Sequence, residues 1–466
     1  MLRELRIKNF KAWEETGYIK MAPLTLFFGR NSSAKSSIGQ FLMALKQTIE
    51  LADRKMVLYP GDYNSPVQLG SFQEMVTHRE TVRRIEFKYV WDLVEDMKVT
   101  DPVTGQFYMG NRMSFEATVG FGEQEQPPVV LWQLEYKLRT KDRRLLSIGM
   151  ERVSGKKPEY KVTSQDYDLK RNQGRPWSPG APVRFYGFPD EVVAYYQNAS
   201  FVQELNLSHE KLYRSIYYLD PLRERPERRY QWAGNEPESV GYSGENTVAA
   251  ILAARGRNIS LGKYHRQKPF EEVIAAEMKK MDLVEHFEVS KQGQEYEVKL
   301  RVKGSRDMVE LPDVGFGISQ VLPVLVECFY APANSIIIME QPETHLHPSA
   351  QAALADVVID VINSRELAGE RNIQLVIETH SEHFLRRLQR RIAEGAIPQE
   401  NVAAYFTDVS KGQAWMEALQ IDEFGNIKNW PDNFFGDEMT DVTEQSKAAM
   451  RKRMSQSKTQ EATTHA

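Results

Sequence analysis

The stretch "LTLFFGRNSSAKSSIGQFLMALKQTI", residues 24–49, decides the fold. Its first residues, up to Gly29, are mostly apolar and predict a strand. Apolar side chains then recur at helical spacing and predict a helix over residues 33–52, with one face made by Ile38, Phe41, Leu42, Leu45 and Ile49. Residues 24–49 therefore predict an apolar strand, a polar turn and an amphipathic helix.

The turn between this strand and helix matches the phosphate-binding pattern G-x-x-x-x-G-K-[ST], except that Ala34 replaces its second glycine. We expect this change to be mild, because the methyl group is small and a helix-start φ is open to alanine. Such a turn aims backbone N–H groups and the positive end of the helix dipole at one point, which holds phosphate. Lys35 would then reach the β- and γ-phosphates, and Ser36 would ligate Mg²⁺. The loop alone also fits an ordinary strand–turn–helix, so only the rest of the sequence can distinguish a nucleotide-binding loop from a plain turn.

The composition favours a globular chain without a strong charge bias. The 466 residues are 41% hydrophobic, enough to build sizeable cores, and no apolar run approaches the about 20 residues that span a bilayer. The N-terminus is charged from its third residue, unlike a secretory signal. The single cysteine, Cys328, lies in an apolar run, which indicates a buried thiol and a reducing cytoplasm. The net charge of −4 gives no global case for binding nucleic acid or anionic membrane.

Three further segments place polar groups where apolar runs end. "SIIIMEQPETHLHPSAQAAL" (335–354) predicts a buried strand ending in Glu340, and "IQLVIETHSEHFLRRL" (373–388) predicts another with His380 just beyond it. Ligands of parallel sheets bind at the carboxyl edge of the strands, where these side chains would emerge. "LPDVGFGISQVLPVLV" (311–326) is a Gly-rich turn that opens a helix, with Ser319 available for a second phosphate contact.

The motifs "GRNSSAKSS", "DVGFGISQ", "IIIMEQPETHLHP" and "IETHSEHFL" occur in this order and together resemble the ABC-type ATPase heads of the RecF, SMC and OLD branch. Members of this branch are often described as AAA-type ATPases of bacterial antiphage defence loci, of PARIS-like or Septu-like type. The resemblance covers residues 1–52 and 311–390, and "YYLDPLRERPERRY", "VGYSGEN" and "GNIKNWPDNFF" resemble one subfamily of stand-alone ATPases.

The resemblance implies an α/β fold, an ABC-type P-loop ATPase head with an antiparallel β flank and a helical insertion. Short alternating runs from about residue 83 to 165 independently predict an antiparallel meander. The expected segments are the N-terminal part of the ATPase core with Walker A (1–82), an antiparallel β subdomain (83–190), a helical insertion (191–294), the C-terminal part of the core (295–440) and a polar tail (441–466).

The resemblance also implies a role for each matching residue, with ATP and Mg²⁺ as cofactors. The expected nucleotide-binding residues are Gly29, Asn31, Ser32, Ser33, Ala34, Lys35, Ser36 and Ser37, with Gly315, Gly317 and Ser319 forming a signature that closes on ATP held by the opposite subunit. Ser36 and Glu340 would hold Mg²⁺, and the expected catalytic residues are Glu340, Gln341, Glu343 and the switch histidine His380. Gln68 or Gln73 would supply a Q-loop contact.

The chain departs from its relatives at Gln341, which stands where they place a catalytic glutamate. An amide cannot accept the proton of the attacking water as a carboxylate can. Either Glu343 or Glu378 takes this role through a shifted geometry, or hydrolysis is slow and ATP acts mainly as a clamp.

Other interpretations of the same residues stay open from the sequence. The histidines His345, His347, His380 and His383 are also compatible with a metal hydrolase. Lys35, Glu340 and His380 could be ordinary polar groups at element ends, and Ser319 an ordinary helix cap. The basic runs 223–229 and 386–391 could contact phosphates or be solvated surface.

The expected partners follow from the resemblance as well. They are a second copy of the chain through ATP-sandwiched heads, or a higher homo-oligomer, together with a separately encoded nuclease or toxin and a phage protein as trigger. No D-x-D pair follows His380 and the chain has no C-x₂-C pair, so neither a TOPRIM nor a zinc-bound HNH module is expected within it. The alternative from another class is a RecF-like DNA repair ATPase whose partner is DNA, against which the net charge of −4 weighs. We expect no membrane partner.

Overall fold

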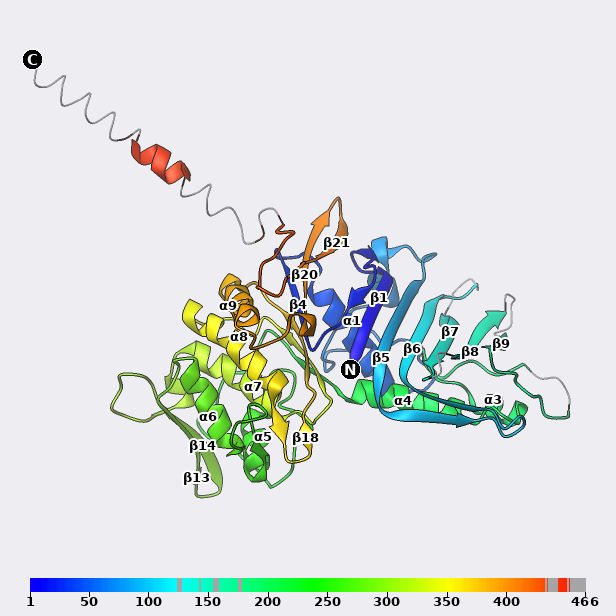
Figure 1. The fold of residues 1–466 in the computed structure, drawn as a ribbon, viewed down its shortest axis with the longest axis horizontal. Helices are drawn as coiled ribbons and strands as arrows, with labels where there is room; N and C mark the ends of the chain where they lie inside the picture. Colours follow the sequence, from blue (N-terminus) through cyan, green and yellow to red (C-terminus); the bar gives the residue numbers. More distant parts are fainter. Residues whose placement is uncertain are drawn as a thin grey trace, which may run out of the picture. The chain divides into compact units, whose positions relative to one another are not determined.

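The computed structural model describes residues 1–123, 128–141, 144–153, 159–174, 178–431, 434, 443–450 and 452. Residues 1–428 form one compact unit, and residues 429–466 form a second. Within the second unit residues 443–450 are helical, and most of the predicted polar tail 441–466 lies outside the described residues. The strands labelled in Figure 1 belong to the first unit.

The centre of the first unit is a six-stranded sheet in which every neighbouring pair is parallel except the last. In sheet order its strands are β10 (Ile216–Leu219), β16 (Ile336–Glu340), β19 (Gln374–Glu378), β4 (Leu24–Gly29), β20 (Val402–Ser410) and β21 (Gln413–Ala418). Every residue of β4, β10, β16 and β19 is buried, which is why these strands are mostly apolar. The predicted α/β class, with an antiparallel flank, is confirmed.

An eight-stranded antiparallel sheet makes the flank. Its strands alternate buried and exposed positions, because one face packs on the core and the other meets solvent. The predicted meander is confirmed, and it is extended by strands from the N-terminus. The strands are β1 (Leu2–Phe10), β2 (Trp13–Glu15), β3 (Ile19–Lys20), β5 (Ile85–Thr100), β6 (Phe107–Phe121), β7 (Val129–Arg139), β8 (Leu145–Val153) and β9 (Glu159–Gln165).

Helix α1 (Ser36–Glu50) lies between the two sheets (Figure 1). Phe41 on α1 contacts Phe10 and Phe87 of the antiparallel sheet, with ring centroids 5.0 and 5.2 Å away, and belongs to the same buried cluster as Ile338 of β16. The opposite face of β16 packs on α7 (Phe316–Tyr330), where Cys328 Sγ lies 4.0 Å from Met339 Sδ. The predicted burial of Cys328 is therefore confirmed, and burial raises the pKa of its thiol to about 12.

The remaining elements are shorter or cover the sheets from outside. The helices are α2 (Phe72–Met75), α3 (Asp190–Tyr195), α4 (Val202–Arg214), α5 (Thr247–Ala253), α6 (Phe270–Lys280), α7 (Phe316–Tyr330), α8 (Pro348–Asn363) and α9 (Glu382–Ala393), with 3₁₀ turns η1 (Thr77–Arg79), η2 (Ala254–Gly256), η3 (Leu311–Asp313) and η4 (Gln399–Asn401). A three-stranded antiparallel sheet comprises β13 (His286–Gln292), β14 (Glu295–Arg301) and β15 (Val309–Glu310). Two short ladders pair β11 (Asn258–Ile259) with β12 (Lys268–Pro269), and β17 (Arg365–Glu366) with β18 (Gly369–Glu370).

The segment 191–294 is more than the expected helical insertion. It contains α4, α5 and α6, yet it also supplies β10, which pairs in parallel with β16 at the edge of the core sheet. Pairing between residues so far apart in sequence depends on tertiary packing, which hydrophobic periodicity does not encode. This pairing brings the loop after β10 to the end of β16.

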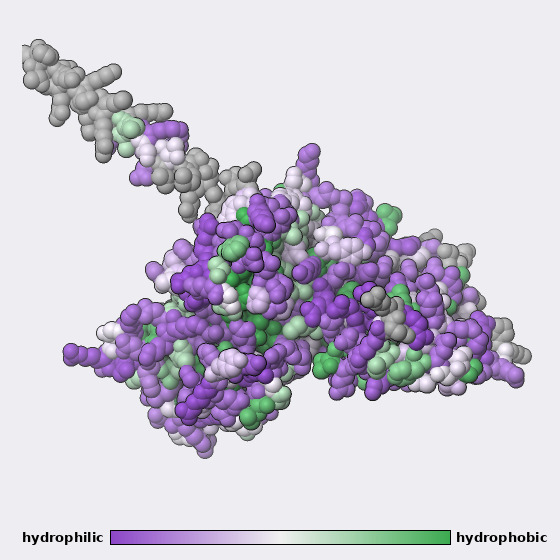
Figure 2. All heavy atoms as spheres, viewed as in Figure 1, coloured by the Kyte–Doolittle hydropathy of each residue, from purple (hydrophilic) through white to green (hydrophobic). Residues whose placement is uncertain are grey.

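Hydrophilic side chains predominate on the face of the molecule seen in Figure 2, with small hydrophobic areas between them. Within the described ranges, no helix has both the length and the apolar character needed to cross a membrane.

Candidate nucleotide-binding site

Three neighbouring parallel strands bring the predicted polar residues to one edge of the core sheet. Glu340 ends β16 and pairs in register with Glu378, which ends β19 and pairs with Phe27 of β4. The carboxyl ends of parallel strands share one edge, so the loop after β4 opens beside both carboxylates. The structure therefore brings Lys35, Glu340 and Glu378 into one neighbourhood.

Lys35 lies at the end of this loop and is buried, with only 4% of its surface exposed. Its ammonium donates hydrogen bonds to the carbonyls of Gly29 and Arg30, at 3.1 and 2.7 Å, and lies 3.9 Å from Glu378 Oε1. Burial lowers the pKa of Lys35, and the surrounding carboxylates, Glu378 first, oppose that shift. The lysine is thus a desolvated cation whose ligands are mostly loop carbonyls, which an anionic ligand could replace.

The serines of the loop hold its shape. Trp13 of β2 donates its indole N–H to Ser37 Oγ at 2.7 Å, and Ser37 in turn donates to the Ala34 carbonyl. Ser33 Oγ lies 2.8 Å from Thr407 Oγ1 on β20. Asn31 and Ser32 are exposed at the tip of the loop.

The expectation that Ala34 adopts a helix-start φ is wrong. Its φ is +63°, in the left-handed region, and Ser32 has a φ of +62°. The loop must reverse direction between β4 and α1, and this reversal is what requires positive φ at both residues. A left-handed conformation costs a non-glycine residue about 1–2 kcal/mol, so Ala34 occupies a position that favours glycine.

Glu340 is the buried acid at the end of β16. Its Oε1 accepts a 2.8 Å hydrogen bond from the Tyr218 hydroxyl, and the Ser36 side chain also hydrogen-bonds this carboxylate. Burial, reinforced by the charge of Glu378, raises the pKa of Glu340 to about 7, against the lowering effect of the two hydroxyls. A hydroxyl and a carboxylate that touch each other are the oxygen donors that Mg²⁺ prefers, so Ser36 and Glu340 fit the predicted metal position.

Glu343 and Glu378 each keep one buried carboxylate oxygen, Oε2, without a hydrogen-bond partner in the part of the chain that the structure describes. The other oxygen of Glu343 accepts a 2.7 Å hydrogen bond from the His380 backbone N–H, and burial raises the pKa of Glu343. Unpaired buried oxygens are costly, so they point to groups that enter from outside, such as water, metal or nucleotide.

His380 lies half-buried beside the same loop. Burial, together with the charge of Lys35, lowers the pKa of His380 to about 4, while a hydrogen bond to the Gly29 backbone opposes the shift. The imidazole is therefore neutral at neutral pH and can donate only one ring hydrogen bond.

Gln341 follows Glu340 with a left-handed φ of +45°. Its backbone N–H donates a 2.8 Å hydrogen bond to the Glu378 carbonyl, which continues the ladder between β16 and β19. Its side-chain amide makes no hydrogen bond to any described residue. Besides Glu340, the carboxylates that line the site are those of Glu343 and Glu378.

The signature turn, residues 313–319, is at a separate place. Gly315 precedes the first residue of α7, and Ser319 is buried with its hydroxyl donated to the Phe316 carbonyl at 2.8 Å. Gly317 packs on the loop after β16, because a Cβ there would lie 2.6 Å from the His345 carbonyl. No hydrogen bond or ion pair among described residues links this turn to the loop that carries Lys35. The exposed residues of the turn are Asp313, Gly315 and Phe316, whereas the sequence favoured Ser319.

Other candidates are engaged elsewhere. Gln68 and Gln73 are exposed and donate to the carbonyls of Tyr63 and Arg79. His347 bonds Ser349 at the start of α8, and no group of three His, Cys, Asp or Glu residues in the described ranges could hold a metal ion. The arginines of run 386–391 form ion pairs on the surface of α9.

Sequence reasoning missed four residues that shape the site: Trp13, Thr407, Tyr218 and Arg223. Tyr218 lies in the apolar strand β10, where nothing marks a polar role. Arg223 is only 8% exposed and donates to the Glu340 carbonyl at 3.3 Å, whereas its basic run suggested either phosphate contact or solvated surface. Only the unusual density of charge in "RERPERR" could have drawn attention to it.

Comparison with known proteins places this site in a family. Residues 397–445 match a family described as "Protein of unknown function (DUF3696)", and no curated protein matches the chain. The SMC head domain from Thermotoga maritima is 10% identical over 90% of this chain and 99% of that one, with a TM-score of 0.39. An Smc head domain from Pyrococcus furiosus, with an extended coiled coil and bound to the C-terminal domain of ScpA, is 10% identical over 90% and 96%, with a TM-score of 0.38. At these scores neither likeness bears on the function.

The match that covers most of the chain runs over residues 24–386 and includes Lys35, Ser36, Glu340, Glu378 and His380. An AAA domain is an ATPase domain, which agrees with a lysine, a hydroxyl and buried acids gathered at the end of a parallel sheet. This chain belongs to the family described as "AAA domain, putative AbiEii toxin, Type IV TA system".

Proposed function

We propose that this protein binds Mg-ATP at the end of β4 and hydrolyses it slowly. The observation that carries the proposal is the convergence of Lys35, Ser36, Glu340 and Glu378 from three elements at one sheet edge. Lys35 would exchange its bonds to the loop carbonyls for bonds to the β- and γ-phosphates.

Ser36 and Glu340 would hold Mg²⁺, which supplies charge neutralisation at the β- and γ-phosphates when bound. Tyr218 orients the Glu340 carboxylate from one side. The neutral His380, next to the Lys35 loop, would exchange its hydrogen bond to the Gly29 backbone for one to the γ-phosphate.

A proton acceptor for the attacking water is available in Glu343 or Glu378, since each has a buried oxygen without a partner in the described part of the chain. Gln341 cannot accept that proton. Glu343 or Glu378 would act from a position other than the one after Glu340, where relatives place the base, so we expect slow turnover, and ATP would hold the protein in one state for long periods.

Calorimetry with Mg-ATP tests the site directly. Lys35→Ala should abolish binding, because the loop lysine supplies the charge that faces the phosphates. Lys46→Ala is the matched control: Lys46 lies on the same helix and pairs with Glu50 and the Tyr213 carbonyl, away from the loop. Unchanged affinity in the Lys35 variant, or an equal loss in both variants, would overturn the assignment.

We further propose that two copies close head to head on ATP through the signature turn, as the resemblance to ABC-type heads implies. Gly315 is the position to test, because its φ is −58° and a Cβ there meets open space. Gly315→Arg should leave Mg-ATP binding to the isolated protein unchanged and prevent nucleotide-driven association measured by light scattering. Association that survives this variant would count against the turn as a contact surface.

In the cell, we propose that the protein is the sensor or scaffold ATPase of an antiphage system with a separately encoded effector. The family description, which includes the words "putative AbiEii toxin, Type IV TA system", supports a defence role. Plaque assays with the neighbouring genes present or deleted test it: Lys35→Ala should abolish protection, and protection without a neighbouring gene would exclude a separate effector.

A RecF-like DNA repair role remains the alternative. It predicts DNA affinity that falls steeply with salt, as phosphate contacts require. A DNA-binding titration at two salt concentrations separates the two roles.

A further inference from the structure

The arginines of "RERPERR", residues 223–229, do not form a free basic patch. Arg223 is buried, and Arg228 and Arg229 make ion pairs. Arg225 is exposed and makes neither an ion pair nor a hydrogen bond with any described residue. Three of the four arginines in this run therefore make contacts within the molecule, and these contacts indicate a structural connection between two sites.

The first set of partners is at the nucleotide site. The Tyr218 hydroxyl donates to Glu340 Oε1 at 2.8 Å, and Arg223 Nη2 donates to the Glu340 backbone carbonyl at 3.3 Å. Arg223 also donates to the Pro221 carbonyl at 3.0 Å, which closes its own loop. One short segment thus holds both the side chain and the backbone of the acid that we assign to Mg²⁺.

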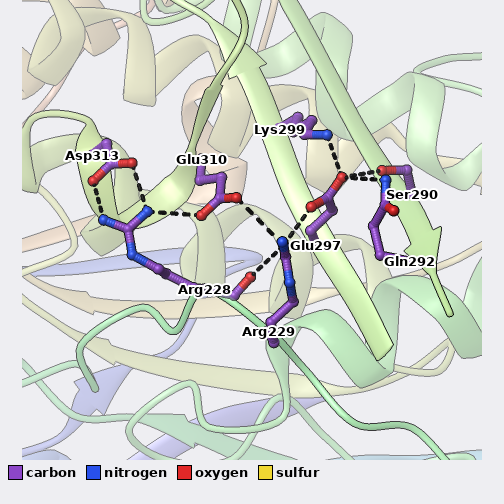
Figure 3. Close-up of polar contacts among 8 residues, drawn as sticks. All are labelled: Arg228, Arg229, Ser290, Gln292, Glu297, Lys299, Glu310 and Asp313. Carbon is purple, nitrogen blue, oxygen red and sulfur yellow. Dashed lines mark hydrogen bonds and ion pairs between the residues drawn. The ribbon is translucent and has the colours of Figure 1, made fainter. Parts of the chain in front are cut away.

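The second set of partners is next to the signature turn (Figure 3). Arg228 donates from two nitrogens to both oxygens of Asp313, at 2.6 and 2.8 Å, and also to Glu310 at 2.8 Å. Asp313 begins the signature turn, two residues before Gly315. Arg229 pairs with Glu297 of β14 and with Glu310. A two-pronged arginine–carboxylate contact fixes orientation as well as distance.

The segment that joins these two sets of contacts, which we call its anchors, has further contacts beside it and just beyond its second end. Tyr230 exchanges two 2.9 Å backbone hydrogen bonds with Tyr296 of β14, just beyond the second anchor. Arg225, Pro226 and Ser319 line one cavity of about 280 Å³, so the segment runs alongside the first turn of α7. Residues 218–229, which we name the strap, therefore connect Glu340 to the signature turn within one chain.

We propose that the strap couples nucleotide binding to the signature turn, with Arg228 as the positioning residue that acts through Asp313. This inference rests on the proposed ATP-driven pairing of two copies. Tyr218 bonds the carboxylate that we assign to Mg²⁺, so a metal bound there would change the charge and position of this carboxylate and shift the strap at its first anchor. The Arg228–Asp313 contact transmits the displacement to the turn that meets the second copy.

The energetics suit a positioning role. Arg228 and Asp313 are both well exposed, with 60% and 46% of their side-chain surfaces accessible, and exposed ion pairs add little stability. Breaking the contact should therefore leave the fold intact while it frees the turn.

The test compares Arg228→Ala with Arg225→Ala, which removes the same charge from the same strap without breaking a contact among described residues. Mg-ATP affinity and melting temperature should match the wild type in both. Nucleotide-driven association, measured by sedimentation, should weaken about tenfold in Arg228→Ala, a loss within the range typical of coupling between two sites. It should remain unchanged in Arg225→Ala. The exchanged pair Arg228→Asp with Asp313→Arg should restore association.

Hydrogen exchange on dilute, unassociated protein supplies a second readout. Mg-ATP should change the protection of residues 311–320 in the wild type and fail to do so in Arg228→Ala. Equal association, or equal changes in protection, in the wild type and Arg228→Ala would overturn the coupling role of the strap and leave the proposed pairing of heads untouched. A wild type that binds Mg-ATP without ever associating would overturn the proposed pairing of heads. The hydrogen-exchange comparison on unassociated protein would then still test whether the strap couples nucleotide binding to the signature turn.

Discussion

If Glu340 holds Mg²⁺ as proposed, its ionisation should make Mg-ATP binding depend on pH in a calculable way. Burial and the charge of Glu378 raise the pKa of Glu340 to about 7, and a metal ligand must be deprotonated. With a pKa of about 7, the ionised fraction rises from about one eleventh at pH 6 to about ten elevenths at pH 8. We therefore expect Mg-ATP affinity to increase about tenfold over this interval.

Fluorescence titration with a labelled nucleotide at pH 6, 7 and 8 measures this change at constant ionic strength. Glu340→Gln is the matched control, since it retains the titration of the nucleotide itself and removes that of Glu340. Without Mg²⁺ the nucleotide affinity should fall as the pH rises, because an ionised Glu340 repels the phosphates. Tyr218→Phe removes a hydrogen bond that lowers the pKa of Glu340, so its binding curve should shift to higher pH. A rise of the same size in Glu340→Gln would refute the reasoning.

Three further predictions follow from the geometry of the site. If Gln341 occupies the base position, Gln341→Glu should raise steady-state phosphate release by about 10²–10⁴-fold; if Glu343 is the base, Glu343→Gln should nearly abolish release instead. Ala34→Gly should stabilise the protein by about 0.5–1 kcal/mol in urea unfolding, because relief of the left-handed φ exceeds the entropy cost of glycine. Gly317→Ala should destabilise by about 1–3 kcal/mol through its backbone clash, whereas Gly315→Ala should stay within about 0.5 kcal/mol.

Each of these has a clear contrary result. A fast wild-type rate that neither the Gln341 nor the Glu343 variant changes would defeat both versions of the base assignment. Loss of stability in Ala34→Gly would show that the loop does not require a left-handed residue. Equal unfolding free energies for the two glycine variants would contradict the close contact between the signature turn and His345.

Local patterns in the sequence were sufficient to predict the strand–turn–helix around Lys35 and the strands that end at Glu340 and Glu378. The physical reason is that a strand buried on both faces is mostly apolar, so the change to polar and charged residues after its apolar run indicates where it ends. Burial of Cys328 follows in the same way from its apolar neighbours.

Tertiary structure alone decided how these pieces meet. The position of β19 between β4 and β16 places Glu378 beside Lys35, and the pairing of β10 with β16 brings Tyr218 to Glu340. The left-handed φ of Ala34 arises because the loop must connect a strand and a helix whose positions are set by both sheets. Periodicity depends only on neighbours along the chain, whereas strand order and backbone reversal depend on contacts between residues hundreds of positions apart.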